Sequence, residues 1–176
     1  MLKTMGKQAK TASRVLAVAT REEKNKALEA IALALEANTE AVLAANEKDL
    51  ANGRANGMSQ ALLDRLKLDE SRIRGIAAGV REVASLPDPV GRVLEETERP
   101  NGLRLVKVSV PMGVIGIIFE ARPNVSVDSA VLCLKSGNAV ILRGGSDAIN
   151  SNTALVGIMR AALESVGLPA DCVKLI

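Results

Sequence analysis

Apolar residues recur at intervals of three or four over the first part of the chain, which predicts a run of amphipathic helices. The clearest case is the spacing of Leu28, Ile31 and Leu35. Thr20 followed by Glu23 is a capping-box signature, so we expect a helix to begin between them. The same pattern predicts two further helices, one beginning near Thr39 and one over residues 71–85. None of these helices carries evident chemistry, and we interpret them as scaffold.

The pattern changes from helical to extended after residue 91. Residues 92–99 are polar, residues 103–110 are rich in Val and Leu, and Pro100-Asn101-Gly102 separates them. This arrangement predicts a β-hairpin whose turn uses the positive φ available to Gly102. The apolar alternation changes phase at Leu105 and Val106. We therefore expect a bulge or a change of sheet partner there.

From residue 112 onward the pattern predicts a βαβαβ arrangement. Residues 113–119 form a continuous apolar run, which is typical of a strand buried on both faces. Residues 138–142 predict a second buried strand, and a third is expected near Cys172. Two apolar helix faces lie between them: Val127, Ala130, Val131 and Leu134, then Leu155, Ile158, Met159, Ala162 and Val166. A parallel sheet that stops after three strands favours the front portion of a longer protein.

Composition narrows the classes of function. The 48% hydrophobic and 24% charged residues are those of a soluble globular protein, with no apolar run of about 20 residues and no secretory signal pattern. We expect a cytoplasmic protein that does not bind a membrane. The absence of histidine excludes His-dependent triads and the usual zinc sites, and we expect no metal. A net charge of +3 and a single aromatic residue argue against nucleic-acid binding.

Two loops follow the first two predicted strands at the edge where open parallel sheets bind ligands. The second loop contains Arg143, Gly144, Gly145 and Ser146. An Arg at this place accommodates the 2′-phosphate of NADP, the glycines allow close approach of a ligand, and Ser146 begins a helix whose N–H groups attract anions. Spacing alone supports equally a plain loop in which Ser146 or Asp147 is an N-cap. A GxGxxG fingerprint is absent, which argues against an ordinary Rossmann domain.

The first loop contains Arg122 and Asn124. An Asn amide at a strand end can donate a hydrogen bond to an oxyanion that develops during acyl transfer. The simpler alternative, which the residues by themselves favour, is a turn residue after Pro123. Cys133 lies on an apolar helix face and Cys172 begins a strand, so we interpret both as buried structural thiols and neither as a nucleophile.

Residues 111–152, PMGVIGIIFEARPNVSVDSAVLCLKSGNAVILRGGSDAINSN, resemble the gamma-glutamyl phosphate reductase branch of the aldehyde dehydrogenase superfamily. The variants EARPN and ILRGGS are the specific part of this resemblance. The EKDL segment and the upstream helices fit as well, so the resemblance covers essentially the whole chain. It implies an α/β, aldehyde-dehydrogenase-like fold with three parts. These are N-terminal helices over residues 1–91, an oligomerisation hairpin over residues 92–111, and a truncated Rossmann-like NADP-binding part over residues 112–176.

The resemblance also implies roles for the loop residues. Asn124 takes the oxyanion-hole position, and Arg143 takes the place of the lysine that contacts the adenosine ribose. Gly144 and Gly145 belong to the same cofactor-binding loop. Ser146 stands where NAD-preferring members carry a glutamate, which agrees with NADP. Arg122 is implied to contact the phosphate or carboxylate of the substrate.

The implied activity is the NADPH-dependent reduction of L-glutamyl 5-phosphate to L-glutamate 5-semialdehyde, with release of phosphate, in proline biosynthesis. A cysteine thiolate attacks the acyl phosphate, and the family places this cysteine downstream of residue 176. We therefore expect the catalytic cysteine domain to be absent and the isolated chain to be inactive. Implied partners are further copies of the chain and, functionally, glutamate 5-kinase. The alternatives are another NAD(P)-dependent semialdehyde dehydrogenase, an assembly module that pairs through its hairpin, and an expression fragment.

Overall fold

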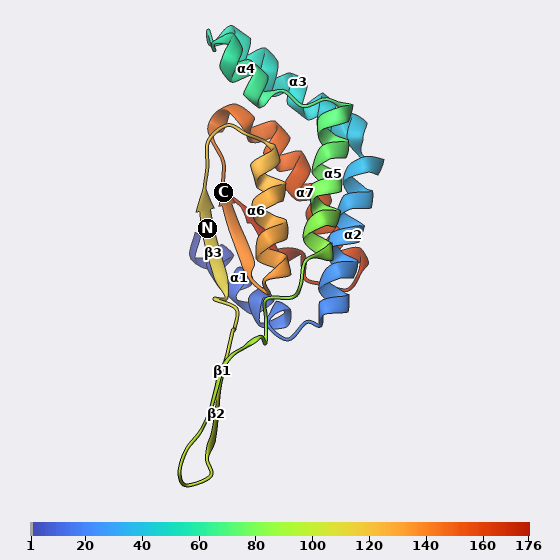
Figure 1. Cartoon of the computed structure of the whole chain (residues 1–176). Coiled ribbons are helices and arrows are strands. Elements are labelled where there is room, and N and C mark those ends of the chain that lie inside the picture. The colour runs from blue at the N-terminus through green and yellow to red at the C-terminus, as the bar shows by residue number, and fades with distance from the viewer. Residues whose placement is uncertain (1) are drawn as a thin grey trace.

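The computed structural model describes residues 2–176, in which five N-terminal helices precede a projecting hairpin and a parallel sheet with two more helices (Figure 1). The N-terminal helices have the following bounds: α1 Leu2–Leu16, α2 Arg21–Ala37, α3 Thr39–Ala55, α4 Gln60–Leu66 and α5 Glu70–Ser85.

The starts of α2, α3 and α5 agree with the sequence-based expectations, and those of α2 and α5 have a local cause. At the start of α2, Glu23 N donates to Thr20 Oγ1 at 3.2 Å and Thr20 N donates to the Glu23 carboxylate at 2.7 Å. The predicted capping box is therefore confirmed. Helix α5 begins at Glu70 because Asp69 is its N-cap and accepts a hydrogen bond from Arg72 N at 2.8 Å.

The predicted hairpin is confirmed as β1 Val93–Glu98 paired antiparallel with β2 Arg104–Val108. Gly102 in its turn has a φ of 80°. The predicted bulge position in β2 is wrong, because the register shifts in β1 between Val93 and Glu95. Both strands are largely exposed, so no buried face ties their apolar alternation to the ladder. The hairpin extends well away from the rest of the molecule (Figure 1).

The sheet has the parallel order β3-β4-β5, as the βαβαβ pattern predicts. Its strands are β3 Val114–Ile118, β4 Ala139–Arg143 and β5 Val173–Leu175, and the connecting helices are α6 Asn124–Lys135 and α7 Ile149–Ser165. The central strand β4 is buried as expected. The expectation that β3 is buried on both faces is not met within this chain, where β3 lies at the edge of the three described strands and Ile118 is 80% exposed.

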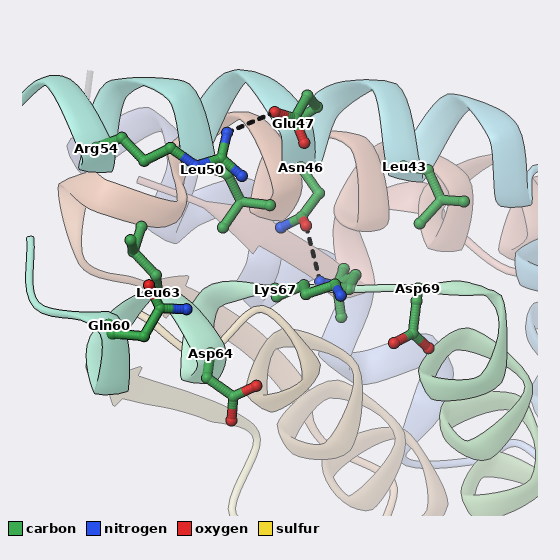
Figure 2. Close-up of a pocket in the computed structure, with 11 residues that line it drawn as sticks. Leu43, Asn46, Glu47, Leu50, Arg54, Gln60, Leu63, Asp64, Lys67 and Asp69 are labelled. Carbon is green, nitrogen blue, oxygen red and sulfur yellow. Dashed lines mark hydrogen bonds and ion pairs between the residues drawn. The ribbon is translucent and has the colours of Figure 1, made fainter.

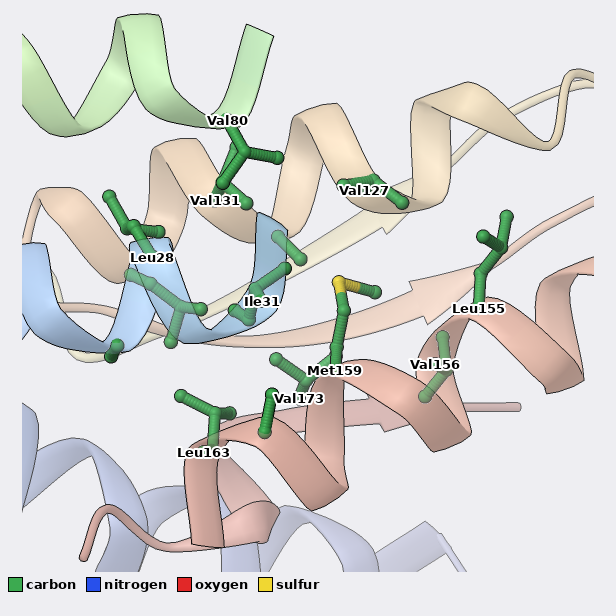
Figure 3. Close-up of a cluster of buried hydrophobic side chains, with 14 of the residues drawn as sticks. Leu28, Ile31, Val80, Val127, Val131, Leu155, Val156, Met159, Leu163 and Val173 are labelled. Atoms are coloured by element: carbon green, nitrogen blue, oxygen red, sulfur yellow. The ribbon is translucent and has the colours of Figure 1, made fainter. Parts of the chain in front are cut away.

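Helices α6 and α7 pack on one face of the sheet, as right-handed crossovers require, and α1 contacts the strands from the other. A single hydrophobic core joins the N-terminal helices to the sheet. Leu28 of α2 and Val80 of α5 lie in it with Val127 of α6 and Val173 of β5 (Figure 3). The predicted face of α6 is fully buried, and that of α7 is buried at Leu155, Met159 and Ala162 and half-buried at Ile158 and Val166. Within residues 2–176, no helix has the length and apolar character that crossing a bilayer requires.

Candidate functional site

The loops that follow β3 and β4 lie against each other at the carboxyl edge of the sheet. Phe119 N donates to Arg143 O at 3.1 Å, which extends the pairing of the two strands into the loops. A Cβ on Gly145 would lie 3.2 Å from Ala121 N, so only a glycine allows this close approach without a local shift. The structure thus brings the EARPN and RGGS segments into contact, and both candidate loops share one edge.

Position 144 requires a glycine for a structural reason that the sequence does not show. A Cβ at this position would collide with Asn152 Nδ2 and would lie 3.1 Å from the Phe119 ring. The space beside Gly144 is therefore taken by the chain's own side chains. Asn152 is fully buried, and its Oδ1 accepts a hydrogen bond from Ser126 Oγ at 2.7 Å. Its Nδ2 has no hydrogen-bond partner among the described residues.

Ser146 does not begin the long helix, contrary to expectation. It starts the short 3-10 turn Ser146–Ala148, and α7 begins at Ile149. The first N–H groups of α7 are bound by Asp49 of α3, which accepts from Asn150 N at 3.1 Å and from Ser151 N at 2.7 Å. The anion position at this helix N-terminus is thus filled by a carboxylate of the chain itself. The alternative of an N-cap at Ser146 or Asp147 is also wrong for α7, because neither side chain caps it.

A buried polar network connects Asp49 to the segment between α4 and α5. Asp49 Oδ2 accepts from Ser151 Oγ at 2.6 Å, and Ser151 Oγ accepts from Asn46 Nδ2 at 3.0 Å. Asn46 also donates to Leu66 O at 2.9 Å and accepts from Leu68 N at 2.7 Å. The sequence gives no sign of this network, since Asn46 and Asp49 are spaced like any polar residues of an exposed helix face.

A hollow of about 670 Å³ lies between α3, α4 and the segment that follows α4 (Figure 2). Most of its charged groups are bonded within the described part of the chain, and the exception is Lys67. Arg54 donates to Glu47 at 2.8 Å, and Arg72 donates to Asp64 Oδ1 at 3.1 Å. Because these pairs are internal, the hollow offers little free charge to a ligand.

Arg143 and Arg122 are both exposed at the carboxyl edge. Within residues 2–176, neither guanidinium takes part in an ion pair or a side-chain hydrogen bond. Both cations are therefore available to an anionic ligand. The two residues follow different strands: Arg122 lies in the loop after β3, and Arg143 is the last residue of β4.

Asn124 is the first residue of α6 and is half-buried, so it is a helical residue rather than part of a free turn. Its Nδ2 donates to Asp128 Oδ2 at 3.0 Å, one helical turn further on. Burial raises the pKa of Asp128, and the hydrogen bond from Asn124 opposes that shift. One hydrogen of the Asn124 amide is thereby used, and the other remains available to an acceptor.

A second hollow, of about 380 Å³, opens beside Asn124 between the end of α4, the first half of α5 and the start of α6. Arg65, Lys67, Arg72 and Asp128 contribute to its lining. The sequence does not bring these four residues together, because they lie on or beside three separate helices. The only available signal was the density of basic residues between positions 65 and 72.

The two cysteines are buried, as predicted. Burial raises the pKa of Cys133 to about 11. Burial, followed by the nearby charge of Asp171, raises the pKa of Cys172 to about 12. Both thiols are therefore protonated at neutral pH and inert as nucleophiles. Among the described residues, no three Cys, Asp or Glu side chains cluster in a way that suits a metal ion.

Comparison with known proteins gives one consistent result, although no protein-family model matches the chain. It is 62% identical over 167 residues to the gamma-glutamyl phosphate reductase of Kineococcus radiotolerans, covering 95% of this chain and 39% of that protein. It is 55% identical over 175 residues to the gamma-glutamyl phosphate reductase of Moorella thermoacetica, covering 99% and 42%. The chain thus spans about two fifths of the length of these curated relatives.

Solved structures agree. The crystal structure of gamma-glutamyl phosphate reductase from Thermotoga maritima matches with a TM-score of 0.98 and 44% identity, over 99% of this chain and 42% of that one. The enzyme of the same name from Saccharomyces cerevisiae matches with a TM-score of 0.90 and 36% identity, over 98% and 45%. A probable aldehyde dehydrogenase from Listeria monocytogenes, at 15% identity and a TM-score of 0.74 over 98% and 35%, shares the fold alone. By sequence and by structure, the chain therefore corresponds to an N-terminal portion of the gamma-glutamyl phosphate reductase family, within the aldehyde dehydrogenase fold.

Proposed function

We propose that this chain forms the oxyanion-binding and adenosine-binding portion of an NADPH-dependent reductase. The reductase converts L-glutamyl 5-phosphate to L-glutamate 5-semialdehyde and releases phosphate, a step in proline biosynthesis. The observation that carries the proposal is the match to gamma-glutamyl phosphate reductases at 62% identity over 95% of the chain. The position of the EARPN and RGGS loops at one edge of the sheet supports it, because the reaction requires the substrate-binding and cofactor-binding residues to lie close together.

Asn124 is the residue of this chain that serves the chemistry. The oxygen of an acyl group gains negative charge when a thiolate or a hydride adds to its carbon, and a fixed N–H donor stabilises that charge. Asp128 holds one hydrogen of the Asn124 amide, so the amide cannot rotate to present its own oxygen. Cys133 and Cys172 are too deeply buried to supply the thiolate, and the family resemblance assigns that role to a cysteine beyond residue 176.

The cofactor loop suits a 2′-phosphate. The aldehyde dehydrogenase fold indicates a nicotinamide cofactor, which supplies hydride when bound. The preference for NADP rests on Arg143, whose exposed guanidinium is not neutralised by any carboxylate of residues 2–176. A charge-assisted pair between Arg143 and a phosphate requires such a free cation. Ser146 adds a hydroxyl without negative charge, and Gly144 and Gly145 let the loop backbone pass close to Asn152 and Ala121. Arg122 is free in the same sense to meet the phosphate of the substrate.

The hairpin supports a homo-oligomer. Its exposed apolar side chains include Val93, Leu94, Leu105, Val106 and Val108. An apolar ribbon that projects from the molecule is typical of a protein–protein contact. We retain residues 1–91, 92–111 and 112–176 as a helical part, an oligomerisation hairpin and a partial NADP-binding part. A cytoplasmic location and a functional association with glutamate 5-kinase belong to the same proposal.

The test is the reverse reaction of the full-length protein, in which L-glutamate 5-semialdehyde reduces NADP in the presence of phosphate. We expect turnover that depends on phosphate and prefers NADP to NAD. Turnover without phosphate and with NAD would favour another semialdehyde dehydrogenase. Concentration-dependent mass without nucleotide binding would favour an assembly module.

A further inference from the structure

The hollow beside Asn124 is lined by charged groups of both signs, which different helices contribute. Arg65 and Lys67, at the end of α4 and just after it, contribute the basic side. Asp128, on the first turns of α6, contributes the acidic side next to Asn124. Its volume of about 380 Å³ is within the range of sites for small molecules. An arrangement of this kind suits a small zwitterion.

The basic side has both a fixed group and free groups. Arg72 is fixed, because it donates to Asp64 O at 2.5 Å and to Lys67 O at 2.7 Å and pairs with the Asp64 carboxylate. These bonds hold the chain from Asp64 to Lys67 in place. The side chains of Arg65 and Lys67 make no ion pair or hydrogen bond within residues 2–176. Two cations therefore remain uncompensated at the border of the hollow.

The acidic side is equally uncompensated. Asp128 pairs with no cation of the described chain, and its hydrogen-bond donor is the neutral amide of Asn124. Asp128 is exposed at the rim of the hollow, and its partial burial there raises its pKa. Asn124 needs only an acceptor oxygen at this place, which a neutral amide also offers, so the hydrogen bond by itself does not require a carboxylate. A cationic ligand group beside Asp128 does give a reason for a carboxylate.

We propose that this hollow is the head-group subsite for an α-amino acid whose side-chain carbonyl reacts at Asn124. Asp128 accepts hydrogen bonds from the α-ammonium, while Arg65 and Lys67 neutralise the α-carboxylate. This inference rests on the proposed function, because it assigns the substrate end that the reaction leaves unchanged.

The dimensions are compatible with this assignment. In a glutamyl group, five bonds separate the α-nitrogen from the acyl oxygen, a reach of roughly 6 Å. Asn124 Nδ2 and Asp128 Oδ2 are 3.0 Å apart. The acyl oxygen would lie about 2.9 Å from Asn124 Nδ2, and the α-nitrogen about 2.9 Å from Asp128 Oδ2. If these four atoms form a bent line, the acyl oxygen and the α-nitrogen are roughly 6 Å apart, which matches the reach of the glutamyl group. One amino acid therefore can reach both Asn124 and Asp128.

The experiment compares two aldehydes in the full-length protein carrying Asp128→Asn. L-glutamate 5-semialdehyde has the α-ammonium, and 5-oxopentanoate has the same chain and carboxylate without it. Asn at position 128 keeps the shape and an oxygen that accepts from Asn124. We expect kcat/KM for the semialdehyde to fall about 10- to 100-fold, mainly through KM, while that for 5-oxopentanoate changes less than about 3-fold. Glu82→Gln, which removes an exposed carboxylate of α5, is the matched control and leaves both unchanged.

A second variant tests the basic side. Replacing both Arg65 and Lys67 with Met is expected to impair use of the semialdehyde and to spare 4-aminobutanal, which lacks the carboxylate. Lys26→Met, on an exposed position of α2, is its control. In Asp128→Asn, an equal loss of kcat/KM for the semialdehyde and for 5-oxopentanoate overturns the subsite, because Asp128 then only positions Asn124. No loss of kcat/KM for either aldehyde overturns it as well.

Failure of the proposed function gives a different result. If the unaltered protein shows no phosphate-dependent turnover, calorimetric titration with L-glutamate 5-semialdehyde still tests the subsite. Binding that Asp128→Asn abolishes and Glu82→Gln preserves supports it. Binding that is equal in the two variants, or absent from the unaltered protein, refutes it.

Discussion

Asp49 is the one fully buried carboxylate within residues 2–176 and binds the start of α7, and its replacement tests whether the position of α7 depends on it. Its Oδ1 accepts from N and Nδ2 of Asn150 at 3.1 and 2.7 Å. Its Oδ2 accepts from N and Oγ of Ser151 at 2.7 and 2.6 Å. Asp49 is only 1% exposed, so water cannot replace these bonds. Asp49→Asn keeps the volume and removes the charge.

The expected cost follows from this geometry. An amide offers one acceptor oxygen, and its NH₂ group would face donors, so two of the four hydrogen bonds are lost. Each bond to a charged acceptor contributes about 1.5–3 kcal/mol, and buried donors left without partners add to the cost. Because such terms are not additive, we expect a total of about 3–5 kcal/mol. This is a large share of the roughly 5–15 kcal/mol of a typical domain.

Hydrogen exchange is the appropriate assay, because it reports local opening and does not require two-state unfolding. In the full-length protein, amides of residues 149–165 are expected to exchange about two to four orders of magnitude faster in Asp49→Asn. Asp147→Asn is the control, since Asp147 is exposed in the neighbouring turn and caps no helix. Unchanged exchange in Asp49→Asn, or equal acceleration in Asp147→Asn, would refute the view that Asp49 anchors α7.

Three further predictions concern the site itself. Asn124→Ala should lower kcat of the full-length protein about 10²- to 10³-fold with little change in KM for NADP, measured by steady-state kinetics; a fall below 3-fold would contradict an oxyanion role. Arg143→Glu should raise KM for NADP at least about 10-fold and leave KM for NAD within about 3-fold, with Arg14→Glu at an exposed position of α1 as the control. Equal effects on the KM values of both cofactors would contradict a contact between Arg143 and the 2′-phosphate. Burial raises the pKa of Cys133 to about 11, so its reactive thiolate is scarce at pH 8, and a thiol reagent should label it only after unfolding in urea. Rapid labelling of Cys133 in the native protein, located by mass spectrometry, would show that this face of α6 is open to solvent.

Local patterns predicted most of the architecture. The capping box at Thr20 and Glu23 involves neighbours in the chain, so its geometry depends on few other residues. The hairpin turn at Gly102 and the buried faces of α6 and α7 have the same local character. Their agreement with the structure reflects periodicity and turn chemistry, which act over a few residues.

The wrong expectations concern relations between distant segments. The bulge lies in β1 and not at Leu105 and Val106. Neither face of the hairpin is buried, so the alternation of apolar side chains does not fix the register of the two strands. The exposure of Ile118 follows from the edge position of β3, which an apolar run does not encode. The helix start near Ser146 is set by Asp49, about one hundred positions away in the chain.

The candidate site divides in the same way. The chain by itself determined which loops carry Asn124 and Arg143, because a parallel sheet places the carboxyl ends of neighbouring strands together. Only the tertiary structure showed that Asn152 lies beside Gly144, that Asp49 occupies the N-terminus of α7, and that Arg65 and Asp128 border one hollow. The physical reason is that helical and strand periods reflect contacts along the chain. The pairing of buried polar and charged groups is decided by packing between elements that the sequence separates by many residues.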